Sequence, residues 1–303
     1  MSQNLRESTM SIVTASMVKE LRALTGAAMM DCKKALEATQ GDMQAAIDHM
    51  RKSGQAQAAK HAGRIAAEGV IAIAINAEKT SAAILEVNCE TDFVARDNDF
   101  KKFADALVKT SLTNHSDHLI KIMSQSLSGS NTTCEQARES LVLKIGENIQ
   151  ARRVALLSAS TIGCIGSYLH GDRIGVLVAL DKKDDVLAKD IAMHIAATRP
   201  IAVDEKTIPV DVLQKEREIF AAQAKTSGKP AHIVEAMVSG RLQKFVKETS
   251  LVHQAFVKNP DQTVGELLTT QKTTVTAFVR FEVGEGIEKQ TADFAEEVKK
   301  LSG

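Results

Sequence analysis

Residues 84–99 are Ile-Leu-Glu-Val-Asn-Cys-Glu-Thr-Asp-Phe-Val-Ala-Arg-Asp-Asn-Asp. An apolar strand pattern ends within this stretch, and a helix pattern with Phe100 and Phe103 on one face follows it. Between the two patterns stands Phe93, beside Asp92 and a run of charges, with no apolar face to join. The chain has only nine Phe, one Tyr and no Trp, so most of its aromatic residues are expected in a core. Phe93 is therefore a candidate contact residue, whereas Phe100 and Phe103 are predicted core residues.

The pattern of two strands and a helix around Phe93 occurs twice in the chain. The predicted elements are strands at 69–75 and 84–87 before the first helix, and strands at 163–169 and 175–180 before a second helix at 186–197. We interpret the two copies as related α+β subdomains with antiparallel sheets.

The first copy is longer than the second. Aligned by sequence, the copies are offset by 92 residues at the second strand, where Ile84 matches Val176, but by 88 at the helix, where Leu107 matches Ile195. The four extra residues of the first copy lie in the segment 91–94. An insertion that the repeat does not need is predicted to serve a surface role.

Residues 15–54 show the apolar periodicity of three short helices. Glycines end the first two helices, Asp42 is suited to cap the third, and Gly54 is predicted to close it. The Ala-rich and basic segment 55–67 is then a helical or flexible tether.

Two adjacent methionines stand near the start of the second of these helices. Met29 belongs to its apolar stripe, with Cys32 and Leu36, and Leu24 belongs to the apolar stripe of the first helix. Because Met29 and Met30 cannot both face the same core, one of them is expected to face outward, where methionine suits an adaptable interface.

The second half of the chain contains a predicted helical hairpin over 209–248 with its turn at 227–230. A strand at 275–283, a Gly-Glu-Gly turn at 284–286 and a terminal helix at about 291–301 follow.

Composition limits the classes of function. The chain has 303 residues, 44% hydrophobic and 25% charged, so we expect a soluble globular protein of two or three modules. Its formal net charge is zero, which argues against a primary nucleic-acid-binding protein. No apolar run reaches the ~18 residues of a membrane span, and no signal peptide begins the chain. We expect a cytoplasmic protein that binds neither membrane nor nucleic acid directly.

Catalytic and metal-binding patterns are absent from the sequence. The four cysteines are far apart and form no Cys-x-x-Cys pair, so neither a zinc site nor a disulfide framework is indicated. No phosphate-binding loop, dinucleotide fingerprint or convergent acid, base and metal set is present. We therefore predict no enzyme, no cofactor and no metal site.

Five separated runs of the chain are distinctive, namely Leu21–Leu36, Glu86–Ala95, Lys144–Ile149, His170–Val178 and Arg280–Gly286. In sequence and in order these runs closely resemble the elongation factor Ts family. The resemblance covers the chain from about Ala15 to its end.

The resemblance implies an α+β fold with five parts. These are a three-helix module similar to ubiquitin-associated (UBA) domains at 13–56, a core N-subdomain at 57–157, a core C-subdomain at 158–199 and 246–285, an inserted helical hairpin or coiled coil at 200–245, and a C-terminal helical module at 286–303.

The resemblance also implies a guanine-nucleotide exchange factor for the translational GTPase elongation factor Tu. Such a factor binds the GTPase with GDP, displaces magnesium, promotes GDP release and leaves when GTP binds. The matching residues for magnesium displacement are Thr91, Asp92, Phe93 and Val94, and those for other GTPase contacts are Arg22, Met29, Met30, Ile145, Gly146 and His170. The hairpin implies pairing of factor molecules, in a homodimer or a two-to-two complex.

Other interpretations of the same residues stay open at this point. The protein could be a helical adaptor that binds another partner through its N-terminal module, with the α+β part as a scaffold. Phe93 could be an ordinary packed ring, Asp92 a cap of the following helix, and His170 an inert exposed residue in a hairpin turn.

Overall fold

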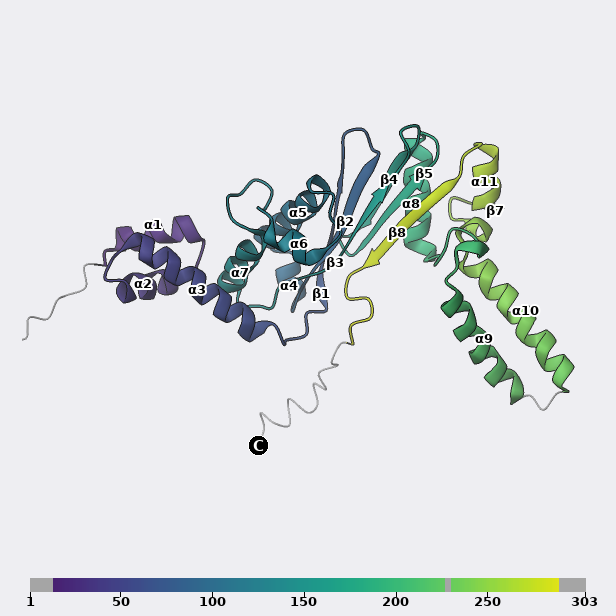
Figure 1. Ribbon diagram of the computed structural model, residues 1–303, viewed down its shortest axis with the longest axis horizontal. Coiled ribbons are helices and arrows are strands. Elements are labelled where there is room, and N and C mark those ends of the chain that lie inside the picture. Colours follow the sequence, from purple (N-terminus) through teal and green to yellow (C-terminus); the bar gives the residue numbers. More distant parts are fainter. Residues whose placement is uncertain (1–12, 227–229, 289–303) are drawn as a thin grey trace, which may run out of the picture.

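The computed structural model describes residues 13–226 and 230–288. A helical module, a core with two three-stranded sheets and a helical hairpin follow one another along the longest axis of the molecule (Figure 1). The predicted α+β class with antiparallel sheets is thereby confirmed. The terminal helix predicted at 291–301 lies outside the described residues.

Three helices form the N-terminal module, namely α1 (Ala15–Thr25), α2 (Met29–Ala38) and α3 (Met43–His61). Their apolar faces enclose a small core of their own, in which Leu21, Cys32 and Leu36 are fully buried. Asp42 caps α3 as predicted, because its carboxylate accepts a hydrogen bond from the Ala45 N–H at 2.9 Å.

The third helix is longer than its sequence suggested. Gly54 does not end α3, which continues to His61, so most of the predicted tether is helical. A Cβ at Gly54 would lie 3.2 Å from the backbone oxygen of Glu139 in α7 (Cys134–Ile145). Glycine at this position thus permits close packing of α3 on the core rather than a break in the helix.

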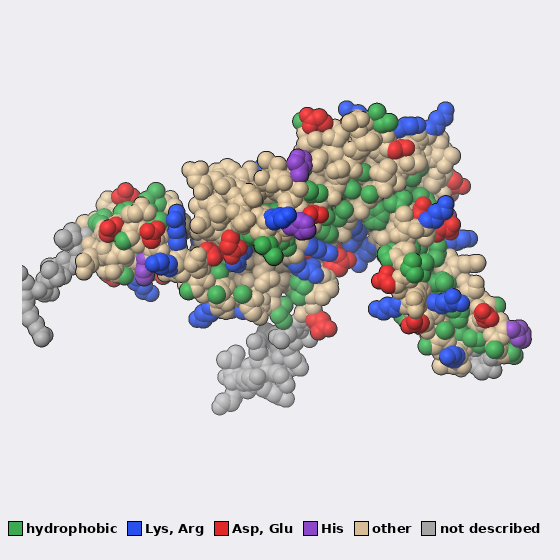
Figure 2. Space-filling view, viewed as in Figure 1, with side chains coloured by type: hydrophobic (Ala, Val, Ile, Leu, Met, Phe, Trp, Pro, Cys, Tyr) green, Lys and Arg blue, Asp and Glu red, His purple; other side chains and the backbone are tan. Residues whose placement is uncertain are grey.

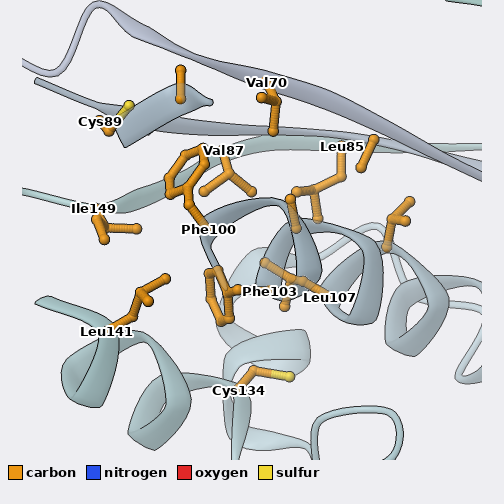
Figure 3. Close-up of a cluster of buried hydrophobic side chains, with 14 of the residues drawn as sticks. Val70, Leu85, Val87, Cys89, Phe100, Phe103, Leu107, Cys134, Leu141 and Ile149 are labelled. Atoms are coloured by element: carbon orange, nitrogen blue, oxygen red, sulfur yellow. The ribbon is translucent and has the colours of Figure 1, made fainter. Parts of the chain in front are cut away.

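The first sheet has the strand order β1-β2-β3, with β1 (Glu68–Ile75), β2 (Ser81–Cys89) and β3 (Gln150–Ser158). The helix α5 (Asn98–Thr113) packs on β1 and β2, with α6 (Leu119–Ser124) and α7 beside it. Figure 3 shows the first core, the cluster of buried side chains between this sheet and its helices. Phe100 and Phe103 lie inside it, which confirms their predicted place.

The second sheet repeats this arrangement. Its order is β4-β5-β8, with β4 (Cys164–His170), β5 (Ile174–Leu180) and β8 (Val275–Glu282), and helix α8 (Asp185–Thr198) packs on it. The second core lies between this sheet and α8 and includes Val176, Val178 and Ile191. In both halves, two hairpin strands and a helix precede a third strand that joins the middle strand of the sheet.

The two sheets pack against each other and leave one helical layer on each outer side (Figure 1). Residues of both sheets form one buried cluster, the sheet interface, which includes Ile71, Ile84 and Leu177. A Cβ at Gly175 would lie only 2.4 Å from Ile71 Cγ2 and 3.0 Å from Ile84 Cδ1. Glycine at position 175 therefore sets how closely the sheets approach.

The alignment of the two copies requires a correction of one residue. Ile84 faces the sheet interface whereas Val176 faces the second core, so the matched pair lies on opposite faces. Since side chains alternate along a strand, only an odd offset keeps the faces equivalent. An offset of 91 matches the last residues of β2 and β5 and pairs Ile84 with Gly175.

The helical hairpin consists of α9 (Val210–Lys225) and α10 (Ala231–Thr249) and points away from the core, at the end opposite the N-terminal module (Figure 1). The rings of Phe220 and Phe245 join its arms edge to face, with their centroids 6.4 Å apart. The short elements after it were not predicted: β6 (Ala255–Phe256), β7 (Asn259–Thr263) and α11 (Val264–Thr270).

Candidate functional site

Phe93 lies on a single helical turn, α4 (Asp92–Ala95), between β2 and α5. Its side chain is 80% exposed, so the interpretation as an ordinary packed ring is wrong. Its neighbours Val94 and Ala95 pack against the first core. One side of α4 is thus anchored in the protein while the other presents an aromatic ring to solvent.

Two residues other than Asp92 cap the helices around this turn. The Thr91 hydroxyl accepts a hydrogen bond from the Val94 N–H at the start of α4, and Asp97 caps α5 by accepting from the Phe100 N–H at 3.0 Å. Asp92 caps neither helix, contrary to one interpretation of the sequence. Its carboxylate instead forms an exposed ion pair with Arg96 at 2.8 Å.

The loop between α7 and β3 holds the segment that precedes Phe93. One carboxylate oxygen of Glu147 accepts hydrogen bonds from the Glu90 and Thr91 N–H groups, both at 3.0 Å. Its other oxygen accepts from the Thr91 hydroxyl at 2.7 Å. In the opposite direction, the Glu90 carboxylate accepts from the Asn148 N–H at 2.6 Å. The two segments therefore exchange hydrogen bonds.

Ile145 and Gly146 occupy the start of the same loop. Gly146 ends α7 in the left-handed conformation, with φ of 84°, and its N–H donates to the Val142 carbonyl at 2.8 Å. Gly146 is exposed, whereas Ile145 is half-buried against the first core. Gly146 is thus the more accessible of the two predicted contact residues.

His170 is exposed, but it is the last residue of β4 rather than part of the turn that follows. The Tyr168 hydroxyl lies 3.2 Å from its Nδ1. In the turn itself, the Asp172 carboxylate pairs with Lys101 of α5 at 2.8 Å. This contact places the β4–β5 hairpin beside the first turns of α5, the helix that also begins just after α4.

The remaining predicted contacts lie on the N-terminal module. Arg22 is exposed, and Met29 and Met30 are 49% and 62% exposed, so both methionines face outward and the core position predicted for Met29 is wrong. Leu24 is also exposed, contrary to its place in the predicted apolar stripe. The structure therefore does not bring these residues together with Phe93 but leaves them exposed on the N-terminal module.

A groove of about 600 Å³ separates the N-terminal module from the core. Leu24, Met50 and Phe103 contribute to its lining, and Lys144 stands at the core side, beside Gly26 of the module. Lys144 also forms an ion pair with Asp99 at the start of α5, which holds the pKa of that carboxyl below its usual range. Figure 2 shows the N-terminal module as a separate lobe beside the core.

Comparison with known proteins identifies the family. The family model described as Elongation factor TS matches residues 90–285. Elongation factor Ts of Thioalkalivibrio sulfidiphilus is 56% identical over 286 residues, which cover 94% of this chain and 97% of that protein. The chain belongs to the elongation factor Ts family. The proteins of the same name from Methylococcus capsulatus and Legionella pneumophila (strain Paris) are 54% and 52% identical to this chain. The matched regions cover 94% and 95% of this chain and 97% and 98% of those proteins.

This member of the elongation factor Ts family is thus a translation elongation factor. None of the helices in residues 13–226 and 230–288 has both the length and the apolar character that a membrane crossing requires. Within the same residues, no group of three His, Cys, Asp or Glu side chains is arranged to hold a metal ion.

A buried cysteine, Cys89, contacts the backbone of Thr91. The pKa of Cys89 is raised to about 12, mainly by burial and secondly by the nearby Glu147 charge, so this thiol stays protonated. Its S–H can therefore donate to the Thr91 carbonyl, which lies 3.2 Å from Sγ. Cys89 acts here as a small apolar residue with a weak donor rather than as a nucleophile.

Sequence reasoning missed the residues that hold the site together. Glu147 and Asn148 occur in one of the runs that resemble the family, yet nothing in their local pattern indicates contact with residues more than fifty positions earlier. A signal was nevertheless present, because a polar Gly-Glu-Asn segment stands between an apolar helix and an apolar strand.

Proposed function

We propose that this protein is the guanine-nucleotide exchange factor of elongation factor Tu, that it acts in the cytoplasm, and that it does so without chemical conversion of a substrate. The observation that carries the proposal is the exposed ring of Phe93 on an anchored helical turn. Membership of the elongation factor Ts family supports the partner.

Phe93 would act as a wedge against the GTPase. A GTPase holds its nucleotide largely through magnesium, which demands near-ideal octahedral oxygen ligands. Packed helices have discrete arrangements, so one ring inserted between them moves the attached metal ligands as a unit. Burial of a Phe side chain contributes about 1.5–3 kcal/mol, which helps to drive displacement but does not supply all of it.

The other contacts would supply the rest of the binding energy. Thr91, Asp92 and Val94 accompany the ring, Gly146 and Ile145 extend the surface on one side, and His170 adds a hydrogen-bonding group near the start of α5. On the N-terminal module, Arg22, Met29 and Met30 form an exposed cationic and apolar surface suited to a second contact. Two contacts on separate modules would hold the GTPase while the ring is inserted.

Release of the factor follows from thermodynamic linkage. A protein that weakens nucleotide binding to the GTPase is itself weakened, by the same factor, when nucleotide binds. Incoming GTP with magnesium therefore expels the ring and the factor leaves. Pairing of factor molecules through α9 and α10 and the five domain boundaries stay predictions.

The test is the release of a fluorescent GDP from elongation factor Tu. Wild type should accelerate release, and Phe93→Ala should lower the catalysed rate about ten- to hundredfold, the equivalent of one buried ring. Ile120→Ala is the matched control, because Ile120 is an 88% exposed apolar residue on α6, outside the proposed contacts.

Two outcomes would contradict the proposal. Failure of wild type to accelerate release would remove the exchange function and favour the adaptor interpretation. Equal acceleration by wild type and Phe93→Ala would leave exchange standing but would remove the wedge.

A further inference from the structure

We propose that Glu147 is a positioning residue that holds the Phe93 turn in its outward, binding-competent orientation. The inference rests on the proposed exchange function and assigns the orientation of the ring to one carboxylate on another loop. Glu147 itself is half-buried beneath the turn and need not touch the GTPase.

The hydrogen bonds of Glu147 converge on the two residues that precede α4. Its carboxylate accepts from two consecutive backbone N–H groups, of Glu90 and Thr91, and from the Thr91 hydroxyl, at 2.7 to 3.0 Å. Three donors on one carboxylate constrain both the position and the rotation of this backbone. Thr91 is the residue that caps the turn carrying Phe93.

Thr91 makes further hydrogen bonds within α4 and with Cys89. Its carbonyl accepts from the Ala95 N–H at 3.2 Å and lies 3.2 Å from Cys89 Sγ, and its hydroxyl oxygen accepts from the Val94 N–H. A single helical turn is not stable alone, because nucleation fixes several residues for few hydrogen bonds. The tertiary contacts of Thr91 must therefore supply the stability that α4 lacks.

A second set of contacts locks the brace in place. The Glu90 carboxylate accepts from the Asn148 N–H at 2.6 Å and pairs with Arg64 at 3.3 Å. The Asn148 side chain donates to the Arg64 carbonyl at 2.7 Å. These hydrogen bonds connect three segments: the Phe93 turn, the loop after Gly146 and the residues around Arg64 that follow α3.

The consequence for exchange is preorganisation. A ring on a loosely held turn would have to be ordered on binding, and this cost would reduce the energy available to displace the magnesium ligands. A braced turn has already lost that freedom during folding. Removal of the brace should therefore slow exchange even though the ring is still present.

The second half of the chain offers a matched control. Between β5 and α8, the Asp181 carboxylate accepts from the Thr273 hydroxyl at 2.6 Å and from the Thr274 N–H at 2.8 Å. This brace holds the equivalent connection, which has no exposed ring. Because both donors use one oxygen, Oδ1, Asp181→Ala is the variant that removes the contact. It should weaken the fold comparably to Glu147→Ala and leave exchange unchanged.

The experiment measures catalysed release of fluorescent GDP for wild type, Glu147→Ala, Glu147→Gln and Asp181→Ala, each also combined with Phe93→Ala. We expect Glu147→Ala to slow release about tenfold and Glu147→Gln, which keeps one acceptor oxygen, to slow it less. In the Phe93→Ala background, Glu147→Ala should add little, because the brace acts through the ring. Hydrogen exchange of the amides at 90–94 in the free protein should speed up in Glu147→Ala.

The outcomes separate this inference from the proposed function. Suppose that wild type accelerates release, Phe93→Ala does not, and Glu147→Ala matches wild type. The positioning role of Glu147 is then contradicted, while the exchange function and the role of Phe93 stand. The positioning role fails equally if Asp181→Ala slows release as much as Glu147→Ala, or if Glu147→Ala slows the Phe93→Ala protein by the same factor as it slows wild type. If wild type does not accelerate release, the exchange function and the brace fall together.

Discussion

The two halves of the core share one topology but differ in the connection between the middle strand and the helix. Eight residues, 90–97, link β2 to α5, whereas four residues, 181–184, link β5 to α8. The predicted difference of four residues is thereby confirmed, although both offsets are one smaller than predicted, 91 at the strand ends and 87 at the helix starts. The extra length contains α4, and α4 carries the most prominent aromatic ring of the described surface. A connection of four residues satisfies the fold, so the additional residues are free to serve binding.

Both connections are held by hydrogen bonds to the segment that precedes the third strand of their sheet. In the first half these bonds run both ways, because Glu147 before β3 accepts from the connection and Glu90 of the connection accepts from the Asn148 N–H. In the second half the carboxylate belongs to the connection, at Asp181, and the donors Thr273 and Thr274 stand just before β8. These hydrogen bonds hold the pKa of Asp181 below its usual range. A carboxylate of the connection thus accepts from a backbone N–H before the third strand in both halves, and the first half adds a second carboxylate, Glu147.

The sheet interface shows a second difference between the halves. At equivalent positions stand Glu86, which is fully buried, and Leu177. Glu86 pairs with Arg153 at 2.5 Å and Arg152 at 3.0 Å and accepts from the Gly284 N–H at 2.8 Å. The first half therefore binds the turn after β8 through a buried charge, whereas the second half packs an aliphatic side chain.

An exchange of these two residues should have the largest effect on stability. Leu177→Glu places a carboxylate in an apolar cluster opposite Val279, where an unpaired charge costs several kcal/mol, and should prevent folding. Glu86→Leu removes one acceptor from each of two partly exposed arginines, from the Gly284 N–H and from the Asn88 side-chain amide, and should cost about 2–3 kcal/mol. Urea unfolding measures both. Equal stability of the two variants would show that the halves do not differ at this position.

The close approach of the sheets at Gly175 should give an intermediate effect. Gly175→Ala forces its methyl group against Ile71 Cγ2 and should destabilise the protein by about 1–3 kcal/mol. Ile71→Ala removes the nearest opposing atom, Cγ2, so the double variant should be more stable than the sum of the two single effects predicts. Strict additivity in urea unfolding would contradict the packing described here.

The smallest effect concerns pH and only the second core. His194 of α8 is fully buried, its Nε2 lies 3.0 Å from Gln254 Oε1, and its Nδ1 accepts from the Val257 N–H. Burial lowers the pKa of His194 below its ordinary 6.5. As pH falls, the unfolded chain therefore takes up this proton at a higher pH than the folded protein does. The stability that neutral, buried His194 contributes is complete above about pH 7 and is lost as pH falls through and below 6.5.

The free energy of unfolding should accordingly decrease between pH 7 and pH 5, by at most about 1.4 kcal/mol per pH unit from this residue. His194→Gln should flatten the dependence in that window. His115→Gln, a change at an exposed residue between α5 and α6, is the control and should leave the slope as it is. An unchanged slope in His194→Gln would show that the second core is no more acid-sensitive than the first.

Local patterns predicted most elements because their causes are local. Asp42 caps a helix, short apolar runs rich in Val and Ile form β1 and β5, and Pro230 stands directly before α10. The errors arose where packing overrode a local signal. Gly54 marks a close contact rather than a helix end, and Leu24 and Met29 belong to a surface although their spacing fits a core.

The sequence by itself determined the α+β class, the repeat, the outward place of Phe93 and the family, since each depends on periodicity, length or residue identity along the chain. Only the tertiary structure decided which faces of the two copies are equivalent and which residues hold the ring. Glu147 lies more than fifty residues from Phe93 in the chain, and its carboxylate meets the Thr91 backbone only because β2 and β3 are neighbours in one sheet. Hydrogen bonds between distant segments follow from that pairing, and no local pattern records it.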